Sequence, residues 1–166
     1  MIVKPAHGQL LPEVDAVIRS MLSSAKEHVE FSTGLTTGGL NRLRPEFENC
    51  LGRISTFHLL LDSTVDLVRF RFEYDWVFSH PNATVRLSQT VGPHWLMVDG
   101  RDFRLEESHD PPLAGSPSVL DENRSNTLIL NCEKGLASEL ERTFGAWWDH
   151  GQAIVRSPSQ TPARST

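Results

Sequence analysis

The sequence lacks the features that mark several protein classes. Its 166 residues include only two cysteines, Cys50 and Cys132, which lie far apart and in no metal-ligand spacing. We expect both to be small buried side chains in a reducing compartment. No apolar run approaches the length of a membrane span, and the first residues show no charged-then-apolar signal pattern. The sequence therefore predicts a cytoplasmic protein without a membrane span.

Positive charge is also scarce. The chain has 16 lysines and arginines against 21 acidic residues, a formal net charge of −5. Domains that bind nucleic acid by bulk electrostatics are basic, so this balance disfavours a nucleic-acid partner, although a local basic patch stays open. No phosphate-binding loop closed by Gly-Lys-Ser/Thr and no internal repeat is present. Length and composition predict a single domain over residues 1–155 and a polar, disordered tail over 156–166.

Helical and strand patterns alternate along the chain. Apolar residues recur at helical spacing over residues 11–25, 40–51 (interrupted at Pro45), 65–78 (capped by 62–64) and 136–148 (capped by Asn131). Alternating or short apolar runs predict strands at 28–32, 54–61, 83–88, 94–98, 103–106 and 127–130. This order predicts an α/β fold with a mixed, mostly parallel sheet and helices on both of its faces.

The segment 91–107 organises the C-terminal half of this pattern. The strand 94–98 is nearly all apolar, as expected for a strand buried on both faces. Asp99-Gly100 is a strong signal for a tight hairpin turn, because glycine adopts positive φ without a steric penalty. The return strand 103–106 alternates apolar and polar residues, which predicts that one of its faces is solvated. We therefore expect a late β-hairpin.

This hairpin resembles the core hairpin of the phospholipase D-like superfamily, where the first strand carries the catalytic pattern H-x-K-x-x-x-x-D and a D-G turn follows. Registered on Asp99-Gly100, the family's aspartate falls on Asp99, its lysine on His94 and its histidine on Gly92. The resemblance covers most of residues 10–150 and implies one half of a phospholipase D-like protein. Because Gly92 has no side chain to attack phosphorus, it also implies a degenerate motif and no catalytic residue.

Polar residues near the hairpin and after the first strand are the candidate ligand-binding residues. His94 faces the place of the family's cation, and the hydroxyl-rich loop after 28–32 lies at a strand end where open α/β sheets bind ligands. The candidates are His94, Asp99, Arg104, Glu106, His109, Thr33 and Thr36. The alternative for each is structural: a satisfied buried histidine, a solvated arginine–glutamate pair and an ordinary strand-to-helix turn. No metal site or cofactor is predicted, because the spacing fits no metal-ligand pattern.

These observations favour a non-catalytic binding or regulatory module that mediates protein interaction or ligand sensing. The alternative is a divergent phosphodiesterase or nuclease-type hydrolase that uses His94 and the Arg104–Glu106 face. In the active family two halves meet, so the resemblance implies that a lone half forms a homodimer or binds another protein domain. The candidate interface residues are the four tryptophans, Trp76, Trp95, Trp147 and Trp148.

Overall fold

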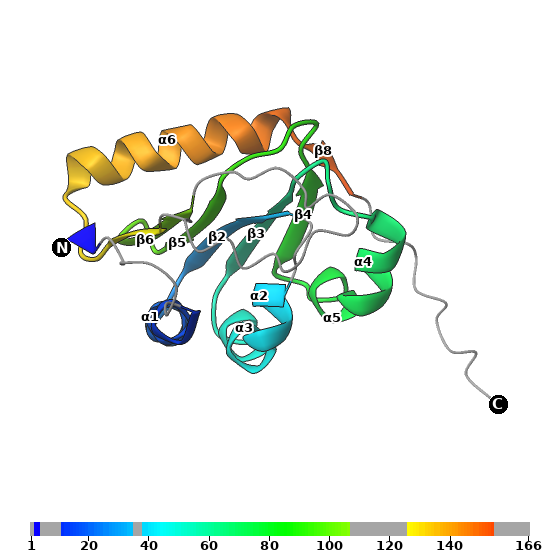
Figure 1. Ribbon diagram of the computed structural model, residues 1–166, viewed down its shortest axis with the longest axis horizontal. Coiled ribbons are helices and arrows are strands. Elements are labelled where there is room, and N and C mark those ends of the chain that lie inside the picture. Colours follow the sequence, from blue (N-terminus) through cyan, green and yellow to red (C-terminus); the bar gives the residue numbers. More distant parts are fainter. Residues whose placement is uncertain (1, 4–10, 35–37, 107–125, 155–166) are drawn as a thin grey trace.

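A twisted eight-stranded sheet forms the centre of the computed structural model of the chain (Figure 1). The structure describes residues 2–3, 11–34, 38–106 and 126–154. The strands are β1 (Ile2–Val3), β2 (His28–Thr33), β3 (Thr56–Leu61), β4 (Ala83–Leu87), β5 (His94–Val98), β6 (Asp102–Glu106), β7 (Asn126–Ile129) and β8 (Gln152–Ala153). The helices are α1 (Leu11–Ser24), α2 (Gly38–Arg42), α3 (Arg44–Leu51), α4 (Leu67–Glu73), α5 (Asp75–Phe78) and α6 (Lys134–His150).

The strand order is β1-β7-β6-β5-β2-β3-β4-β8. β2 pairs in parallel with β3, and β3 with β4, whereas the other five pairings between the described strands are antiparallel. The mixed α/β class is confirmed, but the expectation of a mostly parallel sheet was imprecise. Residues 88–93, between β4 and β5, are too few for a crossover of about a dozen residues, so β5 enters beside β2 in the opposite direction.

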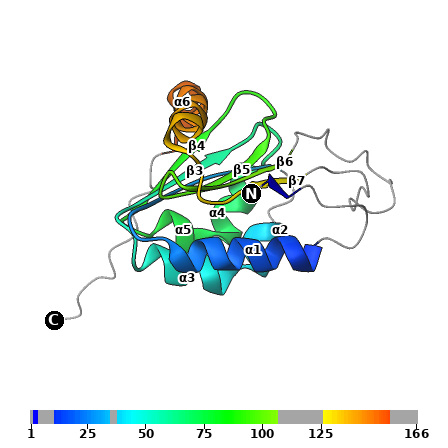
Figure 2. The ribbon, with the colours of Figure 1, turned by 90° about the vertical axis from the view of Figure 1, so that its left-hand side faces the viewer.

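Helices cover both faces of the sheet, as expected. Figure 2 shows α6 alone on one face and α1 to α5 on the other. Strand alternation sends neighbouring residues into two different cores. Leu96 and Val98 belong to the core under α1 to α5, while Trp95 and Met97 pack with Phe144 of α6 in the second core. The sheet therefore separates two hydrophobic cores, one on each of its faces.

The predicted hairpin forms between β5 and β6. Asp99 and Gly100 both have positive φ, of 51° and 59°, and the Arg101 N–H donates to the Val98 carbonyl oxygen at 3.0 Å. The Asp99 carboxylate accepts the backbone N–H groups of residues 26, 27 and 28 at 2.8 to 2.9 Å. These bonds, although burial opposes them, lower the pKa of Asp99. Asp99 thus ties the turn to the start of β2.

Two predicted helix starts and two edge strands differ from expectation. The predicted helix 65–78 is two short helices that meet at Tyr74, and its first cap is Asp66, whose carboxylate accepts the Val68 and Arg69 N–H groups. Asn131 does not cap α6; its φ is +52°, and Glu133 occupies the N-cap position. The strands β1 and β8, two residues each, were missed. Two residues are too few to show a period.

None of the described helices is long and apolar enough to cross a membrane. The predicted tail at 156–166 lies outside the described residues.

Candidate functional site

His94 belongs to a buried cluster of polar and charged side chains on one face of the sheet. His94 Nδ1 lies 3.1 Å from Glu106 Oε2, its partner in the β5–β6 register, and Arg104 Nη2 contacts the same oxygen. Their side chains are only 8 to 10% exposed. Because His94 is one residue from Trp95, which packs under α6, strand alternation places it on the opposite face, toward α1 to α5.

Burial of β6 corrects the expectation of a solvated return strand. Arg104 and Glu106 share one face, as predicted, but that face is covered. Burial alone would raise the pKa of Glu106; the hydrogen bond from His94 and the charge of Arg104 outweigh it and lower that pKa to about 2. Glu106 is therefore a carboxylate at any physiological pH. It supplies the negative charge that pairs with the buried Arg104 guanidinium.

The structure brings some of the predicted site residues together and separates others. His94, Arg104 and Glu106 form the cluster, and Thr33, at the end of β2, lies at the same edge of the sheet. Asp99 lies at the opposite end of β5, where its carboxylate is committed to the turn. His109 and Thr36 lie outside the described residues.

A separate cavity of about 370 Å³ opens at this same edge, on the α6 side. Its polar lining comes from the carboxyl ends of the parallel strands, the loop before β5 and the end of α6: Ser32, Thr33, Asp62, Ser88, Gln89, Thr90 and His150. Its apolar walls are Leu60, Val91, Pro93 and Trp147. His94, Arg104 and Glu106 do not line it, whereas Gly92, at the family's histidine position, does. Of this set only Thr33 was predicted, because the others gather from distant segments.

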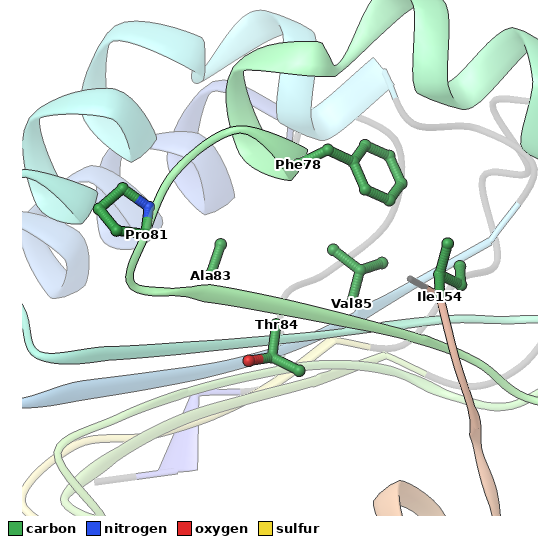
Figure 3. Close-up of a pocket in the computed structure, with 6 residues that line it drawn as sticks. All are labelled: Phe78, Pro81, Ala83, Thr84, Val85 and Ile154. Atoms are coloured by element: carbon green, nitrogen blue, oxygen red, sulfur yellow. The ribbon is translucent and has the colours of Figure 1, made fainter. Parts of the chain in front are cut away.

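A second hollow, of about 220 Å³, lies beside the β4–β8 edge (Figure 3). Much of its lining is apolar and comes from Phe78, Ala83, Val85 and Ile154. Thr84, also in the lining, carries a hydroxyl group. No titratable side chain is among its described lining residues, so this hollow offers no acid–base chemistry.

The four tryptophan side chains pack in or against the two hydrophobic cores of the protein. Trp95 is 2% exposed and makes an edge-to-face contact with Trp147 at 5.6 Å, and Trp148 stacks on His58 at 4.2 Å. Trp76 packs against the core under α1 to α5 and lies under the Arg44 guanidinium, 5.4 Å from its ring. Trp95 is therefore not available to a partner, and the other three are partly covered.

No cluster of three or more histidine, cysteine, aspartate or glutamate side chains that could hold a metal ion occurs among the described residues. Cys50 is buried, as expected, and Cys132 is partly buried. Burial raises the pKa of the Cys50 thiol to about 11, so this cysteine is an unreactive core residue.

Comparison with known proteins rests on structure. No family model and no curated protein sequence matches the chain. A phospholipase D family member, Nuc from Salmonella typhimurium, is 14% identical with a TM-score of 0.62, over 95% of this chain and 99% of its own. NucT from Helicobacter pylori is 12% identical with a TM-score of 0.61, over 93% of this chain and 100% of its own.

A third similar structure is TrmBL2, an archaeal chromatin protein described as having a novel mode of DNA binding. It is 12% identical with a TM-score of 0.67 over 92% of this chain, and the match spans only 54% of TrmBL2. Identities this low establish the fold alone. The chain therefore has the phospholipase D-like fold, as its hairpin predicted.

Proposed function

We propose that this phospholipase D-like unit binds a ligand or a protein partner and does not cleave phosphodiesters. The observation that carries the proposal is the buried cluster in which the Glu106 carboxylate pairs with Arg104 and contacts His94 Nδ1. A phosphodiesterase site needs a nucleophile and cations with free donors for the phosphate oxygens. Here the register on Asp99 places Gly92 at the nucleophile position. The Glu106 carboxylate already contacts Arg104 Nη2 and His94 Nδ1.

The energetics support this proposal. An incoming phosphate would have to displace Glu106 from two charge-assisted contacts inside a covered site. Breaking a buried ion pair costs about 3–5 kcal/mol, because one charge is left without a partner. The cavity on the other face of the sheet needs no such displacement. We therefore place ligand binding in that cavity.

A nucleic-acid partner is the less favoured form of binding. In favour of it, TrmBL2, which is similar to this chain over 54% of its own length, is a DNA-binding chromatin protein. Against it stand the net charge of −5 and the ion pairs that already occupy several arginines, such as Arg42 with Asp15 and Arg69 with Glu73. A duplex is bound mainly through free cations that contact phosphates.

The alternative, a divergent hydrolase, has one observation in its favour. Glu106 lies within hydrogen-bond reach of His94 Nδ1, and a carboxylate in that position orients an imidazole as a general base. The burial of His94 opposes this alternative, because a substrate must reach the imidazole.

Incubation with bis(4-nitrophenyl) phosphate and with single-stranded DNA, each with and without Mg²⁺ or Mn²⁺, tests the proposal. We expect no turnover. Turnover that disappears in His94→Ala, but persists in the equally sized change His80→Ala outside both the cluster and the cavities, supports the hydrolase and overturns the binding module.

Assembly as a homodimer is part of the proposal, but the tryptophans are poor candidates for its interface. Val68 and Phe72 lie one turn apart on α4 and are 82% and 89% exposed. An i, i+4 apolar pair in water favours a covered state, by roughly 25 cal/mol for each Å² of apolar surface. This α4 pair supports a partner surface better than any of the four tryptophans.

A further inference from the structure

We infer that the cavity at the carboxyl ends of β2 and β3 binds a small organic cation: an ammonium or guanidinium group carried on an apolar body. The inference rests on the proposed binding function and adds the chemical class of the ligand. Among the described residues that line the cavity there is no lysine or arginine, and one lining residue, Asp62, is a carboxylate. The cavity therefore has the opposite charge to a phosphate site.

Three polar groups of the cavity, those of Ser32, Asp62 and His150, can accept hydrogen bonds from a ligand. The Ser32 hydroxyl donates its only proton to the Pro93 carbonyl oxygen at 2.6 Å. His150 Nδ1 lies 2.6 Å from the Ala146 carbonyl oxygen, so Nδ1 donates, and Nε2 accepts when the ring carries a single proton. An ionised carboxylate only accepts. A ligand rich in N–H donors satisfies all three of these groups.

Asp62 is held in place as a preorganised counter-ion. It is only 7% exposed, and the Thr64 backbone N–H donates to its Oδ1 at 2.8 Å, together with the Thr64 hydroxyl. Both of the hydrogen bonds that it accepts from described residues are on Oδ1, and its Oδ2 lies against Gly34. The residue facing it is Gly34, where an added Cβ would lie only 2.9 Å from the Asp62 Cγ. Glycine at this position thus makes room for the carboxylate.

Trp147 supplies the second element that a cation site needs. Its ring lines the cavity and is fixed by the edge-to-face contact with the buried Trp95. The face of an indole attracts an ammonium or guanidinium group through its quadrupole. Leu60, Val91 and Pro93 then offer an apolar surface for the body of the ligand. A volume of about 370 Å³ lies at the lower end of small-molecule sites.

Three compounds of the same ring size separate the possible charges. Isothermal titration of the full chain with benzylamine, benzyl alcohol and benzoate compares a cationic, a neutral and an anionic head group. We expect benzylamine to bind at least about tenfold more tightly than benzyl alcohol, since hydrogen bonds to charged groups discriminate by that much. Benzoate should bind most weakly, because it meets the Asp62 carboxylate.

Variants locate the binding. Asp62→Asn keeps the shape of the side chain and should weaken benzylamine binding by roughly tenfold or more, whereas Asp149→Asn, an equal charge change on the exposed end of α6, should not. Gly34→Ala should also weaken it by displacing the carboxylate, and Trp147→Leu by removing the aromatic wall. Circular dichroism of each variant confirms that it is folded.

Two outcomes overturn the inference: benzoate binding as tightly as benzylamine, and benzylamine binding that Asp62→Asn leaves unchanged. Failure of benzylamine to bind up to its solubility limit overturns it as well. These outcomes are independent of the turnover assay. Phosphodiester hydrolysis would remove the proposed binding function yet leave a measured cation site in place, whereas a preference for benzoate without hydrolysis would retain the binding function.

Discussion

Replacing Glu30 by glutamine tests a buried carboxyl under α6. Glu30 lies on β2, on the face toward α6, and its Oε2 is buried with no hydrogen-bond partner among the described residues. Burial, and then the charge of Glu141 on α6, raise the pKa of Glu30 to about 8 from an ordinary 4.5. Its register partner on β3 is His58, whose pKa is lowered by burial and by the nearby charges of His28 and Arg86, so no imidazolium compensates at neutral pH.

The sign of the effect follows from proton linkage. Below pH 4.5 both the folded and the unfolded chain hold the Glu30 proton, so this group contributes no pH dependence there. As the pH rises from 4.5 to about 8, the unfolded chain has released the proton while the folded chain keeps it, and the free energy of unfolding falls. Each pKa unit corresponds to about 1.4 kcal/mol. The rise of the Glu30 pKa from 4.5 to about 8 therefore limits the loss in the free energy of unfolding to roughly 5 kcal/mol. Solvent access and relaxation reduce it to roughly 1–3 kcal/mol.

Glu30→Gln removes the ionisation and should therefore be more stable than the wild type at high pH only. Denaturant unfolding followed by tryptophan fluorescence, at about pH 5 and about pH 8.5, measures the difference in free energy of unfolding at each pH. Any cost of burying the amide is equal at both and cancels. We expect the difference to grow by roughly 1–3 kcal/mol toward high pH. Glu141→Gln should show part of this gain, and the exposed Glu139→Gln none. Parallel pH profiles for Glu30→Gln and the wild type would refute the reasoning.

Three further predictions concern the hairpin, the ion cluster and assembly. Gly100→Val should lower the free energy of unfolding by more than about 1 kcal/mol, because a β-branched residue resists positive φ; an unchanged melting temperature contradicts this. Glu106→Gln should cost about 3 kcal/mol or more in denaturant unfolding, because it leaves Arg104 charged and unpaired, and a loss below about 1 kcal/mol would show that the cluster is solvated. In light scattering we expect a mass of twice 18.6 kDa that Phe72→Ser reduces to the monomer; a monomer at high concentration refutes the homodimer.

Local chemistry explains which parts of the fold the sequence could predict. The turn at Asp99-Gly100 depends on two residues that tolerate positive φ, and the period of α1 is complete within its own length. Pro45 in the first turn of α3 likewise follows from backbone chemistry alone. The break at Tyr74 escaped prediction because aromatic residues continue on both sides of it. The strands β1 and β8 exist through pairing with distant partners and carry no local pattern.

The candidate site was less accessible because burial and approach are tertiary properties. The sequence could place Arg104 and Glu106 on one face, but not show that this face is covered and that His94 joins the same carboxylate. The cavity could be anticipated only at Thr33, from the rule that ligands bind at the carboxyl ends of strands. The sequence pattern placed Asp62 in a helix cap. Its approach to Gly34 could not be predicted, because the two residues lie in segments far apart in the chain.

The direction of β5 explains why the His94–Arg104–Glu106 cluster and the cavity lie at the same edge of the sheet but on opposite faces. Residues 88–93 are too short to cross the sheet, so β5 starts at the edge where β2 and β3 end, and both sites gather there. Alternation then sends His94 to one face and Trp95 to the other. Glu106 can neutralise the first face without touching the second. In the proposals above, the His94 face holds the paired Arg104 and Glu106, and the α6 face holds the ligand site, with Asp62 and Trp147 as its chemistry.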